Sequence, residues 1–132
     1  MMRFTVDRLD HLVLTCRDLD ATAAWYQRVL GMEREVFGAE QRTALKFGGQ
    51  KLNLHQEGRA FSPRAAHALP GTADLCFITA VSPADVVSHL LANAVAVEEG
   101  PVARTGALGP MMSVYCRDPD GNLVEIASYL PD

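Results

Sequence analysis

Residues 9–31 read LDHLVLTCRDLDATAAWYQRVLG, and this stretch decides the fold because a strand pattern in it passes directly into a helix pattern. Branched apolar residues dominate positions 9–15, which is typical of a strand. Asp18 or Asp20 can cap the helix that follows, and Gly31 can end it in the left-handed conformation. One helix face is apolar and is expected to pack on a core; its residues are Leu19, Ala23, Tyr26 and Leu30.

The rest of the chain repeats this order of elements. Gly48-Gly49-Gln50 is expected to turn a hairpin, and Ser82 followed by Pro83 is typical of a second helix start. Residues 99–110 are rich in Gly and Pro and are expected to form a loop, and residues 118–121 a turn. The further expected strands lie at residues 33–37, 43–47, 51–55, 73–79, 95–98, 112–116 and 122–127.

This repetition predicts a duplicated βαβββ unit. The expected fold class is therefore α+β, with two paired βαβββ modules that form a curved mixed sheet. The 132 residues make one domain, with module one at about 7–58, a linker at 59–70 and module two at about 71–129. Each module is too small to be stable alone, which gives their pairing a physical cause.

Composition excludes several classes of protein. Hydrophobic residues make up 48% and charged residues 21%, which excludes intrinsic disorder. A net charge of −4 disfavours a general nucleic-acid binder. The sequence shows no secretory signal and no apolar run long enough to span a bilayer, so we expect a cytoplasmic protein without membrane contact. Cys16, Cys76 and Cys116 lack CxxC spacing and are expected to be reduced thiols.

Four polar residues occupy equivalent strand positions in the two halves. His11 falls on Asp74 under a shift of 63 residues, and His55 falls on Glu125 under a shift of 70. Each alternates with apolar neighbours, so all four are expected to lie on the sheet face away from the helices. Imidazoles and carboxylates in one apolar cavity suit a divalent metal such as Zn, Ni, Mn, Fe or Co. Taken singly, a histidine in a strand is more often a structural residue than a ligand, and an Asp or Glu in a strand is usually solvated.

Two stretches resemble the hallmarks of the vicinal oxygen chelate superfamily: residues 9–32 and the closing DPDGNLVE of residues 118–125. This superfamily includes glyoxalase I, extradiol dioxygenases, fosfomycin-resistance enzymes, methylmalonyl-CoA epimerase and bleomycin-binding proteins. Residues 51–55, 65–67 and 99–107 are also similar to the glyoxalase-domain-containing protein five group and its bacterial relatives, some of them virulence proteins.

The resemblance implies a U-shaped sheet that encloses a metal held by His11, His55, Asp74 and Glu125. The chain departs from the glyoxalase I pattern, which has a carboxylate or Gln where His55 stands and His where Asp74 stands. Either all four residues bind the metal with their positions exchanged, or three residues bind it and Asp74 supports them without binding the metal itself. His67, in the linker, could also reach the site.

The leading functional hypothesis is a metal-dependent, glyoxalase-like lyase or isomerase that chelates a small substrate through vicinal oxygens. Glu125 or Asp74 would act as the base, and the expected substrate contacts are Arg104, Tyr115 and Ser113. One alternative is an extradiol-type dioxygenase, although such enzymes commonly have longer chains. Another is a non-catalytic antibiotic- or metabolite-binding protein of the bleomycin-resistance type, which the four ligand-type residues disfavour. The expected partners are a small-molecule substrate and a second copy of the chain, since a homodimer would cover open sheet edges.

Overall fold

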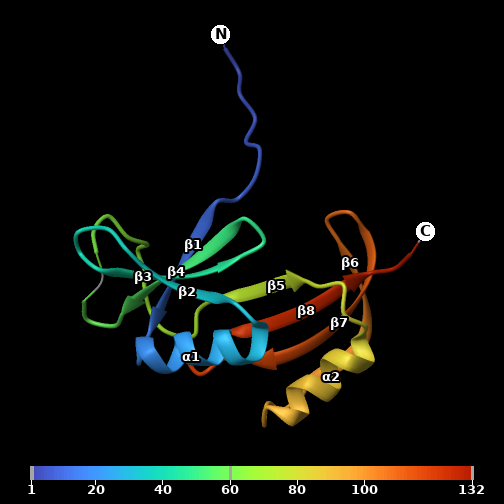
Figure 1. The fold of residues 1–132 in the computed structure, drawn as a ribbon. Helices are drawn as coiled ribbons and strands as arrows, with labels where there is room; N and C mark the ends of the chain where they lie inside the picture. Colours follow the sequence, from blue (N-terminus) through green and yellow to red (C-terminus); the bar gives the residue numbers. More distant parts are fainter. Residues whose placement is uncertain (1, 60, 132) are drawn as a thin grey trace.

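The computed structural model describes residues 2–59 and 61–131 (Figure 1). Module one consists of β1 (His11–Cys16), α1 (Leu19–Leu30), β2 (Glu33–Phe37), β3 (Arg42–Phe47) and β4 (Gln50–Gln56). Module two consists of β5 (Asp74–Ile78), α2 (Pro83–Ala92), β6 (Glu99–Gly106), β7 (Gly109–Arg117) and β8 (Leu123–Tyr129). The predicted α+β class with paired βαβββ modules is confirmed.

The two modules have the same strand order. Module one has the order β1-β4-β3-β2 and module two the order β5-β8-β7-β6. The first pair in each order is parallel and the others are antiparallel. Within the described ranges these ladders make two separate four-stranded sheets, whereas the sequence suggested one curved sheet.

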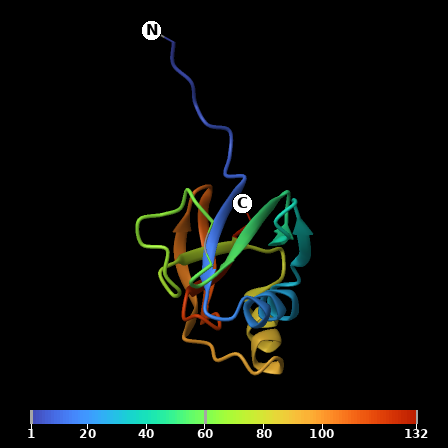
Figure 2. The same ribbon diagram turned by 90° about the vertical axis from the view of Figure 1, so that its left-hand side faces the viewer.

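The helix-facing sides of both sheets share one hydrophobic core. Its buried residues come from both modules, and Tyr26 of α1 makes an edge contact with Phe77 of β5 at 6.5 Å between ring centres. Both helices lie toward the same end of the molecule (Figures 1 and 2), and His89 Nε2 of α2 donates a hydrogen bond to the Val29 carbonyl of α1 at 2.8 Å. Because the apolar faces turn toward this core, the polar faces of the two sheets turn outward.

The predicted helix ends are confirmed. Asp18 caps α1 by accepting a hydrogen bond from the Ala21 amide at 3.1 Å, and Gly31 ends it with φ 65°. Ser82 caps α2 by accepting from the Asp85 amide at 3.2 Å. Neither helix in the described ranges is long and apolar enough to cross a membrane.

The loop between β7 and β8 joins the two modules. Tyr26 Oη donates to Asp118 Oδ2 at 2.7 Å, while Thr22 Oγ1 and the Arg17 amide donate to Asp120 at 2.9 Å each. Asp118 and Asp120 are both 5% exposed. Two carboxylates of module two therefore satisfy buried polar groups of module one, and the loop fixes the modules relative to each other.

The predictions for residues 95–110 are wrong. Residues 95–98 precede the strand instead of forming one, and the expected loop at 99–110 contains β6 and the start of β7. Gly and Pro suggested a loop, but β6 is an edge strand, where the missing N–H of Pro101 is tolerated. Gly100, with φ 111°, lies in a register shift between Glu99 and Val102. Such a bulge uses glycine without ending the strand.

Gly100→Ala is expected to lower the free energy of unfolding by about 2–4 kcal/mol. A Cβ at this position would lie 2.4 Å from the Ser113 carbonyl oxygen and 3.0 Å from the Val114 Cα, in addition to the positive φ. Gly109→Ala is the matched control, because Gly109 also has a positive φ but no atom within 4 Å of a built Cβ. Urea unfolding measures both variants; equal losses would contradict the close approach at Gly100.

Candidate metal centre

The β1 side of the candidate site contains a histidine with one nitrogen already in use. His11 lies at the start of β1, its side chain is 45% exposed, and its Nδ1 donates to Asp10 Oδ1 at 2.8 Å. A carboxylate that holds one ring nitrogen fixes the tautomer and leaves the lone pair of the other for a metal. The local geometry of His11 is therefore that of a metal-binding histidine.

The β8 side is organised around Glu125. Ser113 Oγ of β7 donates to Glu125 Oε2 at 2.6 Å, and Ser113 is fully buried. Tyr115 faces Glu125 across the antiparallel β7–β8 ladder, and Cys76 faces it across the parallel β5–β8 ladder. Asp74 lies two residues before Cys76, so its side chain is on the same face. The sheet thus orients one carboxylate firmly and places a second one nearby.

Arg104 joins this face through Tyr115. Its Nε donates to Tyr115 Oη at 3.0 Å, and its Nη2 donates to Glu99 Oε1 at 3.3 Å. The hydrogen bond to Tyr115 raises the pKa of Arg104. The three predicted substrate contacts, Arg104, Tyr115 and Ser113, therefore lie on the strand face of Glu125, with the guanidinium already paired to an acidic neighbour.

Ladder register changes the equivalence between the modules. His11 pairs with Lys51 in β4, and Asp74 pairs with Leu123 in β8. Two positions further along β8 lies Glu125, and two positions further along β4 lies Asn53. Asn53 is therefore the structural counterpart of Glu125, and the sequence shift that placed His55 there was two residues short.

This register also separates His11 from His55. They lie four residues apart along the β1–β4 ladder, which is about 13 Å of strand rise. Two nitrogens bound to one ion at about 2.1 Å each cannot come from parallel side chains that far apart. Asn53 lies only two residues along from His11, about 7 Å of rise.

Two buried polar atoms on this face lack partners. Asn53 Oδ1 and His55 Nδ1 are both buried without a hydrogen bond among the described residues. Leaving such atoms unpaired costs free energy, so they indicate places where a ligand, ion or water binds. Sequence reasoning missed Asn53; the signal was its position between Leu52 and Leu54, the same alternation that singled out the others.

Within the described ranges, the predicted metal ligands do not come together in one chain. Among the His, Cys, Asp and Glu residues of the described ranges, no group of three lies close enough to hold an ion. The sequence-predicted ligands divide into His11 and His55 on the β1–β4 sheet and Asp74 and Glu125 on the β5–β8 sheet. Each sheet therefore carries half of the predicted donor set.

Cys76 is a thiol with suppressed reactivity. Although the residue is exposed, partial desolvation of its thiol and the neighbouring carboxylate of Glu125 raise its pKa to about 11. At pH 8 we therefore expect iodoacetamide to alkylate Cys76 about a hundredfold more slowly than an ordinary cysteine, with a midpoint near pH 11. Glu125→Gln removes one cause of the shift and is expected to speed alkylation, measured by mass spectrometry. A midpoint near that of a free thiol would contradict this environment.

The fold is that of the paired βαβββ proteins. The model of the Glyoxalase/Bleomycin resistance protein/Dioxygenase superfamily matches residues 8–126, and the chain belongs to this superfamily.

Individual relatives agree with this membership. The chain is 50% identical over 129 residues to virulence protein STM3117 of Salmonella typhimurium, covering 98% of this chain and 89% of the relative. It is 52% identical to glyoxalase domain-containing protein RDO1 of Mycosarcoma maydis, covering 96% of this chain and 71% of the relative. The crystal structure of STM3117 matches with a TM-score of 0.93 over 96% of this chain and 100% of that one. The structure of lactoylglutathione lyase from Agrobacterium tumefaciens matches with a TM-score of 0.72 at 28% identity, over 94% and 95% of the two chains.

Proposed function

We propose that this protein is a metal-dependent, glyoxalase-like enzyme that chelates a small substrate through vicinal oxygens and catalyses a lyase or isomerase reaction. One observation carries the proposal: the pair His11 and Asn53 in the β1–β4 ladder is equivalent to the pair Asp74 and Glu125 in the β5–β8 ladder. In each ladder the second residue lies two positions after the strand partner of the first. The similarity to a lactoylglutathione lyase supports this branch of the superfamily.

The residues present fit a divalent metal. An imidazole nitrogen, an amide oxygen and two carboxylates suit Zn, Ni, Mn, Fe or Co, and the orphaned Asn53 Oδ1 offers a buried oxygen donor. His11, Asn53 and Glu125 would hold the ion, with Asp74 as a further donor. His55, the sequence-predicted fourth ligand, lies too far along the ladder from His11 to share that ion.

The metal centre is formed between two chains. Both sheets pack their apolar faces on one core, which turns their polar faces away from each other. A homodimer that sets the β1–β4 face of one chain against the β5–β8 face of the other would bring the two half-sets together. This arrangement explains why the described part of a single chain holds no group of three donors.

A bound metal would polarise the substrate oxygens and so acidify the adjacent carbon. Glu125 is the proposed base: Ser113 fixes one of its oxygens, and the other would accept a proton when it is not bound to the ion. Arg104 and Tyr115 lie beside it and would orient the substrate. Asp74, on the same face, is the alternative base.

Metal analysis and light scattering of the purified protein test this proposal. We expect a dimer that takes up about one divalent ion per chain and, once loaded, isomerises adducts of methylglyoxal with thiols. Less than roughly a tenth of an ion per chain, with no uptake on adding Ni, Zn, Mn, Fe or Co, would refute the metal-dependent function.

A further inference from the structure

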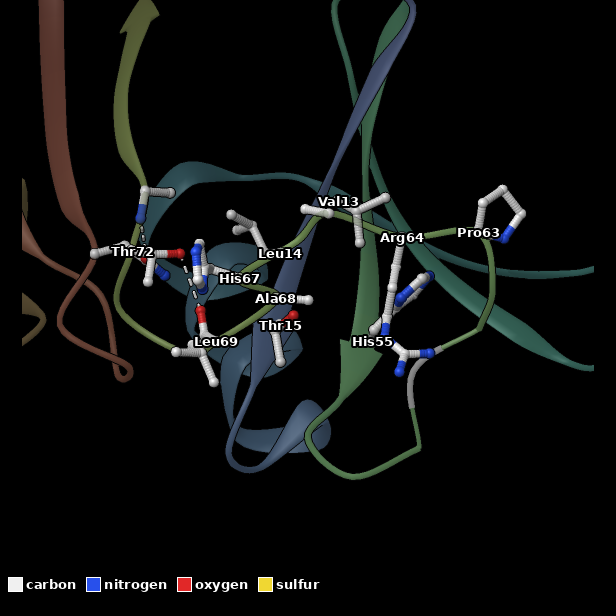
Figure 3. A pocket seen from close by; sticks show the side chains of 13 residues that line it. Val13, Leu14, Thr15, His55, Pro63, Arg64, His67, Ala68, Leu69 and Thr72 are labelled. Carbon is white, nitrogen blue, oxygen red and sulfur yellow. Dashed lines mark hydrogen bonds between the residues drawn. The ribbon is translucent and has the colours of Figure 1, made fainter.

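The linker after β4 covers a small cavity on the β1–β4 sheet (Figure 3). The cavity has a volume of about 130 Å³ and lies between β1, β4 and residues 63–73. Its polar lining comes from the sheet, from residues 63–73 and from the loop between β7 and β8: Thr15 and His55, then Arg64, His67 and Thr72, and finally Asn122. This volume suits a small molecule of a few heavy atoms.

The lining carries positive charge only. A guanidinium and two imidazoles are present, and none of the lining residues is Asp or Glu. Arg64 donates to Ser62 Oγ at 2.8 Å, which holds its side chain next to the cavity without neutralising it. An enclosed space with one fixed positive charge and no negative charge favours a monoanion.

His55 gives the cavity a buried, unsatisfied polar atom. The residue is 6% exposed, and its Nδ1 has no partner among the described residues. Its ring packs edge-on against the Phe61 ring, with 5.3 Å between the ring centres. The Arg42 guanidinium stacks on the same Phe61 ring, 4.0 Å from its centre. A ring held in this way can donate one hydrogen bond from its unpaired nitrogen to a bound anion.

We propose that this cavity binds the carboxylate of a small monoanion through His55 and Arg64. Resting on the proposed function, this carboxylate is the anchored end of the substrate, because His11 and Asn53 lie on the same face of the same two strands. The substrate class is then a hydroxy or oxo acid whose carboxylate lies under the linker and whose vicinal oxygens, several bonds away, lie toward the metal donors.

Titration of the metal-free protein with acetate, acetamide and inorganic phosphate tests the site. Acetate is expected to shift the His55 ring nitrogen signals in NMR spectra in a saturable way, and acetamide, which has the same shape without the charge, to bind at least about tenfold more weakly. No saturable shift up to about 10 mM acetate would overturn the proposal. Equal binding of acetamide would overturn the anionic class, and tighter binding of phosphate would overturn the carboxylate.

Matched variants locate the binding. Arg64→Gln and His55→Gln are each expected to weaken acetate binding about tenfold. Arg34→Gln is the control, since Arg34 lies in β2, outside the cavity, and forms an ion pair with Asp20 of α1. Arg64 is exposed, so its variant keeps the test decisive even if His55→Gln fails to fold. Wild-type affinity in Arg64→Gln would contradict the site.

The metal content of the same variants separates this inference from the proposed function. His55→Gln is expected to keep wild-type metal uptake, and loss of the metal in that variant would make His55 a metal ligand and overturn the carboxylate site. If the wild-type protein binds acetate but takes up no metal, the proposed function fails while the carboxylate site stands.

Discussion

Glu125→Gln is expected to lower the affinity of the protein for its divalent metal about a hundredfold or more. The substitution removes the anionic oxygen but keeps the size of the side chain and an acceptor for Ser113 Oγ, so the fold is expected to remain. Competition with a chromophoric chelator measures the affinity, and circular dichroism checks the fold.

Two further variants sharpen this expectation. Glu35→Gln is the matched control. Glu35 and Lys46 form an ion pair within the sheet of module one, so this substitution is expected to leave metal binding unchanged. Asn53→Leu is expected to weaken metal binding, because it removes the unpaired buried oxygen. Wild-type affinity in both Glu125→Gln and Asn53→Leu would contradict the proposed donor set.

Asp118→Ala is expected to lower the free energy of unfolding by about 3–5 kcal/mol. Asp118 accepts hydrogen bonds from Tyr26 Oη, from the Asn122 side chain and from the backbone amides of Asp120 and Asn122. Truncation leaves all these buried donors without a partner and loosens the contact between the modules. Urea unfolding, followed by circular dichroism, measures the loss.

The size of this effect depends on the number of donors left unpaired. Tyr26→Phe removes only one of the four hydrogen bonds to Asp118 and is expected to cost about 1–2 kcal/mol. Asp20→Ala, at an exposed ion pair with Arg34, is expected to change stability by no more than about 0.5 kcal/mol. If Asp118→Ala costs no more than Asp20→Ala, the loop does not hold the modules together.

The sequence predicted most elements of the fold because their signals are local. Asp18, Gly31 and Ser82 act within a few residues of their helix ends, and the structure confirms all three. Strand β6 was missed because Gly100 and Pro101 are typical of loops, and only the pairing of β6 with β7 shows that they lie in an edge strand with a bulge.

The candidate site was predicted less well because it depends on register. The shift of 70 residues assumed that both hairpins have turns of equal length. In the structure the equivalent pairs are Lys46 with Lys51, which have four residues between them, and Arg117 with Leu123, which have five. Strand β7 is thus displaced by one residue from the assumed shift and β8 by two, which makes Asn53 the counterpart of Glu125.

The residues 118–122 illustrate a second limit. Their composition predicts a turn, and they do form one, but their carboxylates also bind Tyr26, Thr22 and Arg17, which are 92 to 103 positions away in the chain. No local pattern indicates such partners. A motif typical of the superfamily thus stabilises the pairing of the modules in this chain. It also helps to position Glu125, which lies three residues after it.

Mixing two inactive variants tests the shared metal centre most directly. His11→Ala and Glu125→Ala are each expected to bind no metal as homodimers, since every centre lacks a ligand. In a mixed dimer one centre lacks both ligands and the other is intact, so random exchange of subunits is expected to restore about a quarter of the wild-type metal content. Recovery at that level, appearing only after exchange, is the predicted result. No recovery in a mixture shown to contain mixed dimers would contradict a centre formed between two chains.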